Sequence, residues 1–210
     1  MKKSNVKEIL IPTLTLFVIC LIVAALLALT NNLTKEPIAQ QNEKTMMQSM
    51  KSVCPDADSF DEVKTDNDKA SLYKALDKDK NVIGYAVSTS AKGYGGSIGV
   101  MTGIANGEIT AVNVYDTSNE TPGLGTNTSK EAFTDGFKGD ISKEFAVKKD
   151  AKGEQKSVDA VTGATISSRA VVKAVNEAVS LYNEFGKEEA GAANSDGSSA
   201  VLITDDGGEM

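Results

Sequence analysis

The chain contains no histidine and no tryptophan, and only two of its 210 residues are cysteines. Without histidine, a Ser-His-Asp triad, imidazole general-base catalysis and histidine-ligated metal sites are all excluded. Two cysteines are too few to hold an iron–sulfur cluster or a structural zinc ion alone. Cys20 lies in a long apolar run and Cys54 lies outside it, so we expect no disulfide between them. If this chain carries electrons, the carrier must be an organic cofactor.

Charged residues are missing from one continuous stretch of 21 residues, from Ile9 to Leu29. As a helix this stretch would be ~31 Å long, which matches the hydrocarbon core of a bilayer. A cleaved signal peptide has a shorter apolar stretch and ends at a small-x-small site, unlike Ala28-Leu29-Thr30. The run therefore predicts an uncleaved, single transmembrane helix.

The charges that flank this run predict its orientation. Lys2, Lys3 and Lys7 precede it, with Glu8 as the only acidic residue. By the positive-inside rule, the N-terminus lies in the cytoplasm, and everything after Leu29 is extracytoplasmic. Leaving out the four flanking charges brings the net charge from −7 to −9, a surface that repels nucleic acid. We therefore expect a single-pass protein of the cell (inner) membrane that has no nucleic-acid partner.

Short apolar segments separated by turn residues predict an antiparallel sheet in the middle of the chain. Asn106-Gly107 is typical of a type I′ hairpin turn. The last segment before the acidic end has helical periodicity and stops at Gly186. Strands segregated from helices favour the α+β class, with flanking helices on the sheet. The expected strands are 72–76, 82–88, 98–104 and 109–115, and the expected last helix is 167–185.

Other segments complete the expected organisation. Thr34 is placed to cap a stalk helix, and a further helix starting near Ser129 has Phe133 and Phe137 on its inner face. A hairpin is possible around Lys149 to Gly153. The composition after Lys187 predicts an acidic, disordered tail. The predicted divisions are a cytoplasmic N-terminus and anchor (1–33), a stalk helix (34–58), a globular domain (59–187) and the tail (188–210).

Thr165 is the strongest candidate site residue, because an amphipathic helical pattern begins directly after it. Free amides and the positive dipole end at a helix N-terminus favour a phosphate group. Gly163 has no side chain and Ala164 a small one, so the backbone there is approachable. The plainer interpretation is that Thr165 is an ordinary N-cap residue.

The segment Asp159-Ala160-Val161-Thr162-Gly163-Ala164-Thr165 resembles the Asp-x-x-Ser/Thr-Gly-Ala-Thr signature of FMN-binding domains. The resemblance implies that FMN is bound covalently, through a phosphoester to Thr165, with Thr162, Gly163 and Ala164 around it. It also implies that a separate flavin transferase attaches the cofactor from FAD. Asp159 would belong to the sequence that this transferase recognises.

Two further segments resemble loops of the same domains. Glu120-Thr121-Pro122-Gly123-Leu124-Gly125 is similar to their Glu-Thr-Pro-Gly-Leu-Gly loop, and Gly93-Tyr94-Gly95-Gly96 to their Gly-Tyr-Gly-Gly turn. As isolated strings, both are turn sequences. In this order they imply a flavin pocket, with Glu120, Thr121, Gly123 and Leu124 near the cofactor.

Taken together, these segments resemble the family of G subunits of Rnf-type ion-translocating oxidoreductases, and are also similar to the C subunits of the sodium-pumping NADH:quinone reductase. The resemblance implies an electron-transfer subunit, not catalytic alone, in a membrane complex that couples electron flow between ferredoxin and NAD to Na⁺ or H⁺ transport. No NAD fingerprint occurs in the sequence, so the nicotinamide and ferredoxin sites would belong to other subunits. Three other interpretations remain: a C subunit of a Na⁺-translocating NADH:quinone reductase; a free-standing, membrane-tethered extracytoplasmic flavoprotein; and a non-redox anchored binding domain in which Thr165 is only a cap.

Overall fold

A computed structural model of the chain describes residues 6–65 and 70–186. The predicted tail, 188–210, lies outside the described residues. The chain divides into two compact units, residues 1–46 and 47–210, and each is described by itself.

The first unit consists of most of one long helix, α1 (Val6–Val53). The large apolar side chains from Ile9 to Leu29 are exposed, and the helix is long and apolar enough to cross a membrane. The predicted start of a separate helix at Thr34 is wrong. Thr34 lies inside α1, where its hydroxyl donates to the Thr30 carbonyl at 3.0 Å, because no glycine or proline interrupts the helix at residues 30–34.

The second unit is built on a six-stranded antiparallel sheet whose spatial order follows the chain. Its four central strands confirm the predicted segments, and the Asn106-Gly107 turn has positive φ at both residues, as a type I′ turn requires. The edge strand β1 was not expected, because its sequence is mostly polar and its residues are largely exposed. The strands are β1 (Ser59–Val63), β2 (Ser71–Leu76), β3 (Val82–Lys92), β4 (Ser97–Ala105), β5 (Glu108–Asp116) and β6 (Gly139–Asp140).

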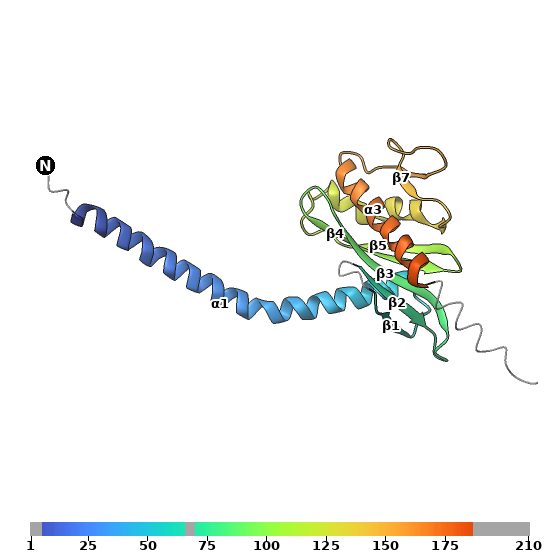
Figure 1. The fold of residues 1–210 in the computed structure, drawn as a ribbon, viewed down its shortest axis with the longest axis horizontal. Coiled ribbons are helices and arrows are strands. Elements are labelled where there is room, and N and C mark those ends of the chain that lie inside the picture. The colour runs from blue at the N-terminus through green and yellow to red at the C-terminus, as the bar shows by residue number, and fades with distance from the viewer. Residues whose placement is uncertain (1–5, 66–69, 187–210) are drawn as a thin grey trace, which may run out of the picture. The chain divides into compact units, whose positions relative to one another are not determined.

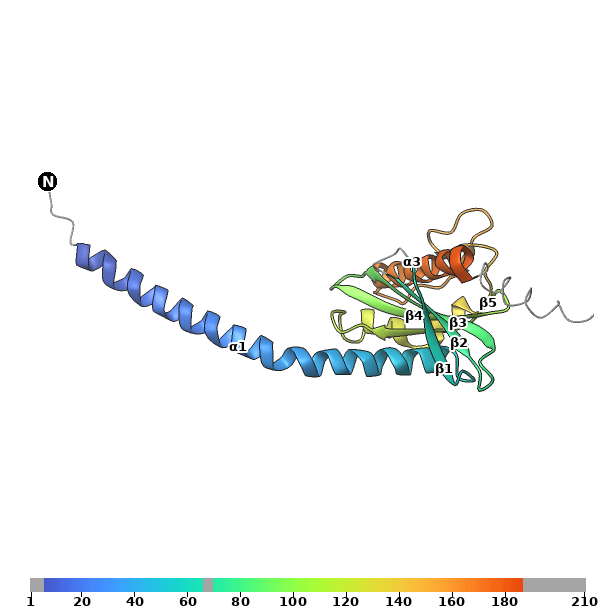
Figure 2. The same cartoon turned by 60° about the horizontal axis from the view of Figure 1, so that its bottom comes forward.

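Helix α3 (Thr165–Leu181) covers one face of this sheet (Figure 1). Its inner residues Val171, Ala174 and Val175 are fully buried, as the periodicity predicts. The last turns of α1, residues 47–53, cover the opposite face (Figure 2). There the Thr110 hydroxyl donates to the Val53 carbonyl at 3.2 Å. The sheet is therefore the middle layer of an α+β unit, which confirms the predicted class.

Short elements connect the sheet to α3. The helix expected near Ser129 is divided into three short turns, η1 (Gly125–Ser129), α2 (Glu131–Thr134) and η2 (Asp135–Phe137), and Phe133 and Phe137 are buried as expected. The hairpin expected around Lys149 to Gly153 is wrong, because β7 (Phe145–Val147) and β8 (Lys156–Val158) pair in parallel. The side-chain amide of Asn176 in α3 bonds both backbone groups of Phe145, at 2.9 and 2.8 Å, and this fixes β7 against the helix. A turn of π-helix, η3 (Tyr182–Gly186), follows α3.

Candidate functional site

A pocket of about 580 Å³ opens beside the N-terminus of α3. This volume lies within the ~300–1,000 Å³ typical of small-molecule sites. The turn before β4, the loop after β5 and the junction that begins α3 supply its walls. The lining residues are Tyr94, Glu120, Thr121, Leu124, Gly125, Gly163, Ala164, Thr165, Ile166 and Ser167.

Thr165 is the first residue of α3, and the N-cap position is occupied by Ala164. Thr165 is therefore not the cap of this helix, and no side-chain cap bond occurs at its start. Within the described chain, the amides of Thr165, Ile166 and Ser167 have no backbone or side-chain acceptor. Three free amides at the positive end of a helix favour an anion directly beside the Thr165 hydroxyl.

Gly163 gives the loop before α3 its shape. Its φ is +77°, in the left-handed region that other residues adopt at a cost. A Cβ on Gly163 would also lie 3.1 Å from Leu124 Cδ2, across the pocket wall. The absence of a side chain therefore permits both the turn and the close approach of Leu124.

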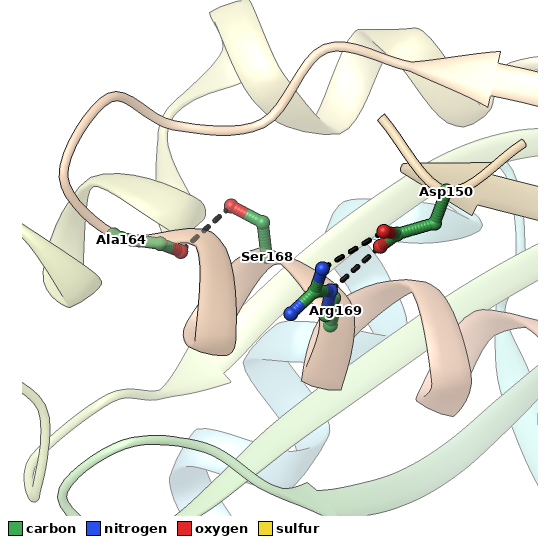
Figure 3. Close-up of polar contacts among 4 residues, drawn as sticks. All are labelled: Asp150, Ala164, Ser168 and Arg169. Atoms are coloured by element: carbon green, nitrogen blue, oxygen red, sulfur yellow. Dashed lines mark hydrogen bonds and ion pairs between the residues drawn. The ribbon is translucent and has the colours of Figure 1, made fainter. Parts of the chain in front are cut away.

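Ser168 holds this loop against the first turn of α3 (Figure 3). Its fully buried hydroxyl donates to the Ala164 carbonyl at 2.9 Å and accepts the Val161 amide at 3.0 Å. The next residue, Arg169, points away from Ser168 and forms a two-point ion pair with Asp150, at 2.6 and 2.8 Å. This pair lowers the pKa of the Asp150 carboxyl, mainly through the hydrogen bonds from Arg169. Consecutive residues of α3 thus fix the loop before the helix and the connection between β7 and β8.

Glu120 joins the three walls of the pocket. Its side chain is only 4% exposed, and Oε2 accepts a 2.6 Å hydrogen bond from the Ser167 hydroxyl. Oε1 accepts a bond of 3.0 Å from the Gly95 amide in the turn before β4. The loop after β5 is therefore tied both to this turn and to the start of α3.

Six of the predicted cofactor contacts line the pocket together: Glu120, Thr121, Leu124, Gly163, Ala164 and Thr165. Gly123 and Thr162 are not among the lining residues. Gly123 shapes the loop instead, since its φ is +76° and its amide donates to the Thr126 hydroxyl at 2.9 Å. Thr162 is exposed on the loop before α3.

Four lining residues were not in the predicted set: Tyr94, Gly125, Ile166 and Ser167. Tyr94 and Gly125 belong to the two loop segments that carry the family resemblance, and this membership could have indicated that they lie near the cofactor. Ile166 and Ser167 directly follow Thr165, and their position at a helix start implied that they would lie near any bound phosphate. No sequence pattern indicated that Ser167 would bond Glu120, 47 residues away.

Asp159, the first residue of the signature, lies outside this pocket. Its side chain is 81% exposed, and Oδ1 forms an ion pair with Lys148 Nζ at 3.1 Å. It lines a separate, smaller cavity of about 270 Å³ together with Lys130 and Phe133. Asp159 is therefore accessible from solvent rather than placed to contact a ligand in the larger pocket.

The donor groups of the pocket fit an organic phosphate better than a metal ion. In residues 6–65 and 70–186, no three acidic, cysteine or histidine side chains gather as metal ligands. Free amides lie at one end of the pocket, beside Thr165. Exposed apolar side chains of Tyr94, Leu124 and Ile166 lie at its rim. Amides that bind a phosphate, together with apolar groups that pack on a ring, are suited to FMN.

Two protein families match parts of this chain. Residues 93–180 match the FMN-binding domain family, and residues 1–53 match the RnfG N-terminal region. The G subunit of the proton-translocating ferredoxin:NAD(+) oxidoreductase complex of Clostridium ljungdahlii is 35% identical, over 88% of this chain and 97% of that protein. The G subunit of the Na(+)-translocating complex of Acetobacterium woodii is 36% identical, over 83% of this chain and 91% of that protein. A solved structure of the C subunit of Na(+)-translocating NADH-quinone reductase from Parabacteroides distasonis is 24% identical, with a TM-score of 0.46 over 55% of this chain and 62% of that one.

Proposed function

This chain belongs to the family of G subunits of ion-translocating oxidoreductases, and on that premise we propose that it carries FMN covalently on Thr165 as a membrane-anchored electron-transfer protein. It relays electrons between ferredoxin and NAD sites on other subunits of an Rnf-type complex, and this flow drives Na⁺ or H⁺ translocation. The observation that carries the proposal is the Thr165 hydroxyl, which lies beside three free helix amides in a pocket of about 580 Å³.

The chemistry of attachment suits this position. A separate flavin transferase supplies FMN from FAD: the Thr165 oxygen bonds to the phosphorus of the FMN half, AMP leaves, and the hydroxyl proton passes to the transferase. The resulting phosphodiester carries one negative charge, which the amides of Thr165, Ile166 and Ser167 stabilise. Gly163 and Ala164 leave space around the new bond. Covalent attachment keeps the cofactor from being lost into the extracytoplasmic space.

The remaining pocket residues bind and orient the ring system. Tyr94, Leu124 and Ile166 are 70%, 43% and 50% exposed, respectively, so their apolar surface is available for a planar ring. When bound, the flavin supplies the redox chemistry, and the protein supplies anchoring, position and electrostatics.

The membrane topology is part of the proposal. The exposed apolar stretch of α1 is the anchor, and Lys2, Lys3 and Lys7 hold the N-terminus in the cytoplasm. The stalk (34–58), the FMN-binding domain (59–187) and the tail (188–210) then lie on the extracytoplasmic side of the inner membrane. Ion transport takes place in other subunits, because the 21 residues of the apolar stretch contain no charge.

The test is an intact-mass measurement on the full chain produced with a flavin transferase. We expect the wild type to gain the mass of one FMN less one water and its denatured gel band to fluoresce under ultraviolet light. Thr165→Ala removes both signals. Thr117→Ala is the matched control, because Thr117 lies outside both the signature and the pocket lining, and this variant keeps both signals. Equal masses for the wild type and Thr165→Ala, apart from the substitution itself, would contradict the proposal and favour a non-redox binding domain.

Purification distinguishes the two hypotheses that the chain is a subunit of a complex and that it is a free-standing flavoprotein. We expect the affinity-tagged chain, isolated from native membranes in a mild detergent, to bring down proteins with several membrane spans. A flavinylated chain that elutes alone would favour the free-standing alternative. The family relationship supports the complex, since both compared relatives are named as subunits of one.

A further inference from the structure

We propose that Glu120 places a buried negative charge beside the flavin and thereby lowers its reduction potential. The inference rests on the proposed function, because it concerns FMN bound in the same pocket. Glu120 lines the pocket, and its side chain is 4% exposed.

Both carboxyl oxygens of Glu120 are hydrogen-bonded. Oε1 accepts the Gly95 amide and Oε2 accepts the Ser167 hydroxyl. The ion pairs of the described chain join other residues, and none includes Glu120. The negative charge is therefore held by neutral donors and is not cancelled by a lysine or arginine.

The surrounding backbone makes room for this carboxylate. A Cβ on Gly93 would overlap Glu120 Oε1, and a Cβ on Gly125 would overlap Oε2. No side chain larger than hydrogen fits at either position while Glu120 stays in place. Burial of a charge without a counter-ion is costly, and groups held in this way are concentrated at functional sites. A purely structural link between the same loops needs no charge.

The sign of the effect follows from electrostatics. Each electron that the flavin accepts from a reductant such as dithionite adds one negative charge, which a solvent proton can neutralise afterwards. A fixed negative charge on the buried Glu120 side chain is screened less by water, so it repels the incoming electron more strongly than an exposed charge would. Glu120 thus makes reduction less favourable and lowers the midpoint potential.

The test is a potentiometric titration of the flavinylated full chain in detergent, with dithionite as reductant and flavin absorbance as readout. Glu120→Gln keeps the shape and an acceptor for Gly95 but removes the charge. We expect its midpoint potential to rise by about 59 mV or more, which is a tenfold change in a one-electron equilibrium constant. Glu108→Gln is the matched control, because Glu108 is exposed at the far end of β5, ~26 Å along the strand. This control keeps the wild-type potential.

Ser167→Ala distinguishes the effect of the Glu120 charge on the potential from the effect of the hydrogen bond that links the two segments. It removes the 2.6 Å hydrogen bond but leaves the carboxylate, so its potential does not rise. Equal rises in Ser167→Ala and Glu120→Gln would overturn the proposal and assign the effect to loop geometry. An unchanged potential in Glu120→Gln would overturn it as well.

Flavin loading is checked first by intact mass. The failure of covalent attachment can then be distinguished from the failure of the proposed effect of Glu120 on the potential. A wild-type chain without added mass contradicts covalent FMN itself. If only Glu120→Gln fails to load, Glu120→Ala takes its place, since it also removes the charge. A midpoint potential raised by about 59 mV or more in Glu120→Ala then supports the charge effect, and a wild-type potential overturns it.

Discussion

The Ser168 hydroxyl donates a 2.9 Å hydrogen bond to the Ala164 carbonyl, one turn earlier, and so fixes the residue before Thr165 (Figure 3). The same hydroxyl accepts the Val161 amide, so the loop before α3 is held at two points by one buried side chain. This side chain therefore fixes the loop that supplies one wall of the pocket.

Replacing this serine tests the arrangement. Ser168→Ala leaves the Val161 amide without its acceptor, and we expect the free energy of unfolding to fall by about 1–3 kcal/mol. Urea denaturation of the full chain in detergent measures the change. Ser129→Ala is the control, because Ser129 is exposed and bonds only the Thr126 carbonyl; it changes stability by less than ~0.5 kcal/mol. Equal stability for Ser168→Ala and the wild type would mean that the loop is held by other contacts.

Gly163 and Gly153 form a matched pair for the pocket. Both have positive φ, +77° and +61°, so alanine at either position is strained by about 1–2 kcal/mol. Only Gly163 has a neighbour in the pocket, Leu124. We expect both variants to lose similar stability but only Gly163→Ala to slow flavin incorporation, measured as the rate of mass gain with purified transferase and FAD. Equal rates for the two variants would show that the pocket tolerates a side chain at residue 163.

Much of this architecture followed from local sequence, and the exceptions have physical causes. The segments that became β2 to β5 are apolar and are separated by turn residues, so each strand was visible in its own sequence. The edge strand β1 pairs on one side only and buries little, and its sequence therefore lacks the apolar pattern of a strand. Strands β7 and β8 pair in parallel, and Asn176, 31 residues from Phe145, binds β7 to α3. Local patterns carry no information on such contacts.

In the site, too, local features were predictable from the sequence and contacts between distant segments were not. The helix start at Thr165 was predictable, because periodicity is a local feature, whereas the left-handed conformation of Gly163 was not predicted. Thr165 was expected as a possible cap, but the cap position falls one residue earlier, which is a shift that periodicity does not resolve. The bond between Glu120 and Ser167 joins segments 47 residues apart, and only the folded chain reveals it.

Cys54 should react slowly with alkylating reagents. Burial raises the pKa of its thiol from 9.0 to about 11, so at pH 8 the thiolate fraction is about 100-fold below that of the unfolded chain. We expect iodoacetamide to modify Cys54 correspondingly more slowly in the folded protein than in urea, with peptide mass spectrometry as readout. Since the unfolded state loses its proton near pH 9 and the folded state near 11, the contribution of this thiol to stability is present below pH 9 and is lost as the pH rises to 11. Equal rates in the folded and unfolded states would mean that Cys54 is accessible.

Asp159 and Lys148 test whether the first residue of the signature serves recognition rather than folding. The two side chains form an exposed ion pair, and such pairs contribute little to stability. If a transferase reads Asp159, then Asp159→Asn abolishes flavin incorporation while thermal unfolding stays unchanged. Lys148→Ala breaks the same pair but keeps the carboxylate, so it still accepts flavin at the wild-type rate. Asp150→Asn provides a further control. It breaks a different ion pair, between Asp150 and Arg169, in the connection between β7 and β8. Loss of incorporation in all three variants would instead indicate that flavin attachment requires the local ion pairs and does not depend on Asp159 itself.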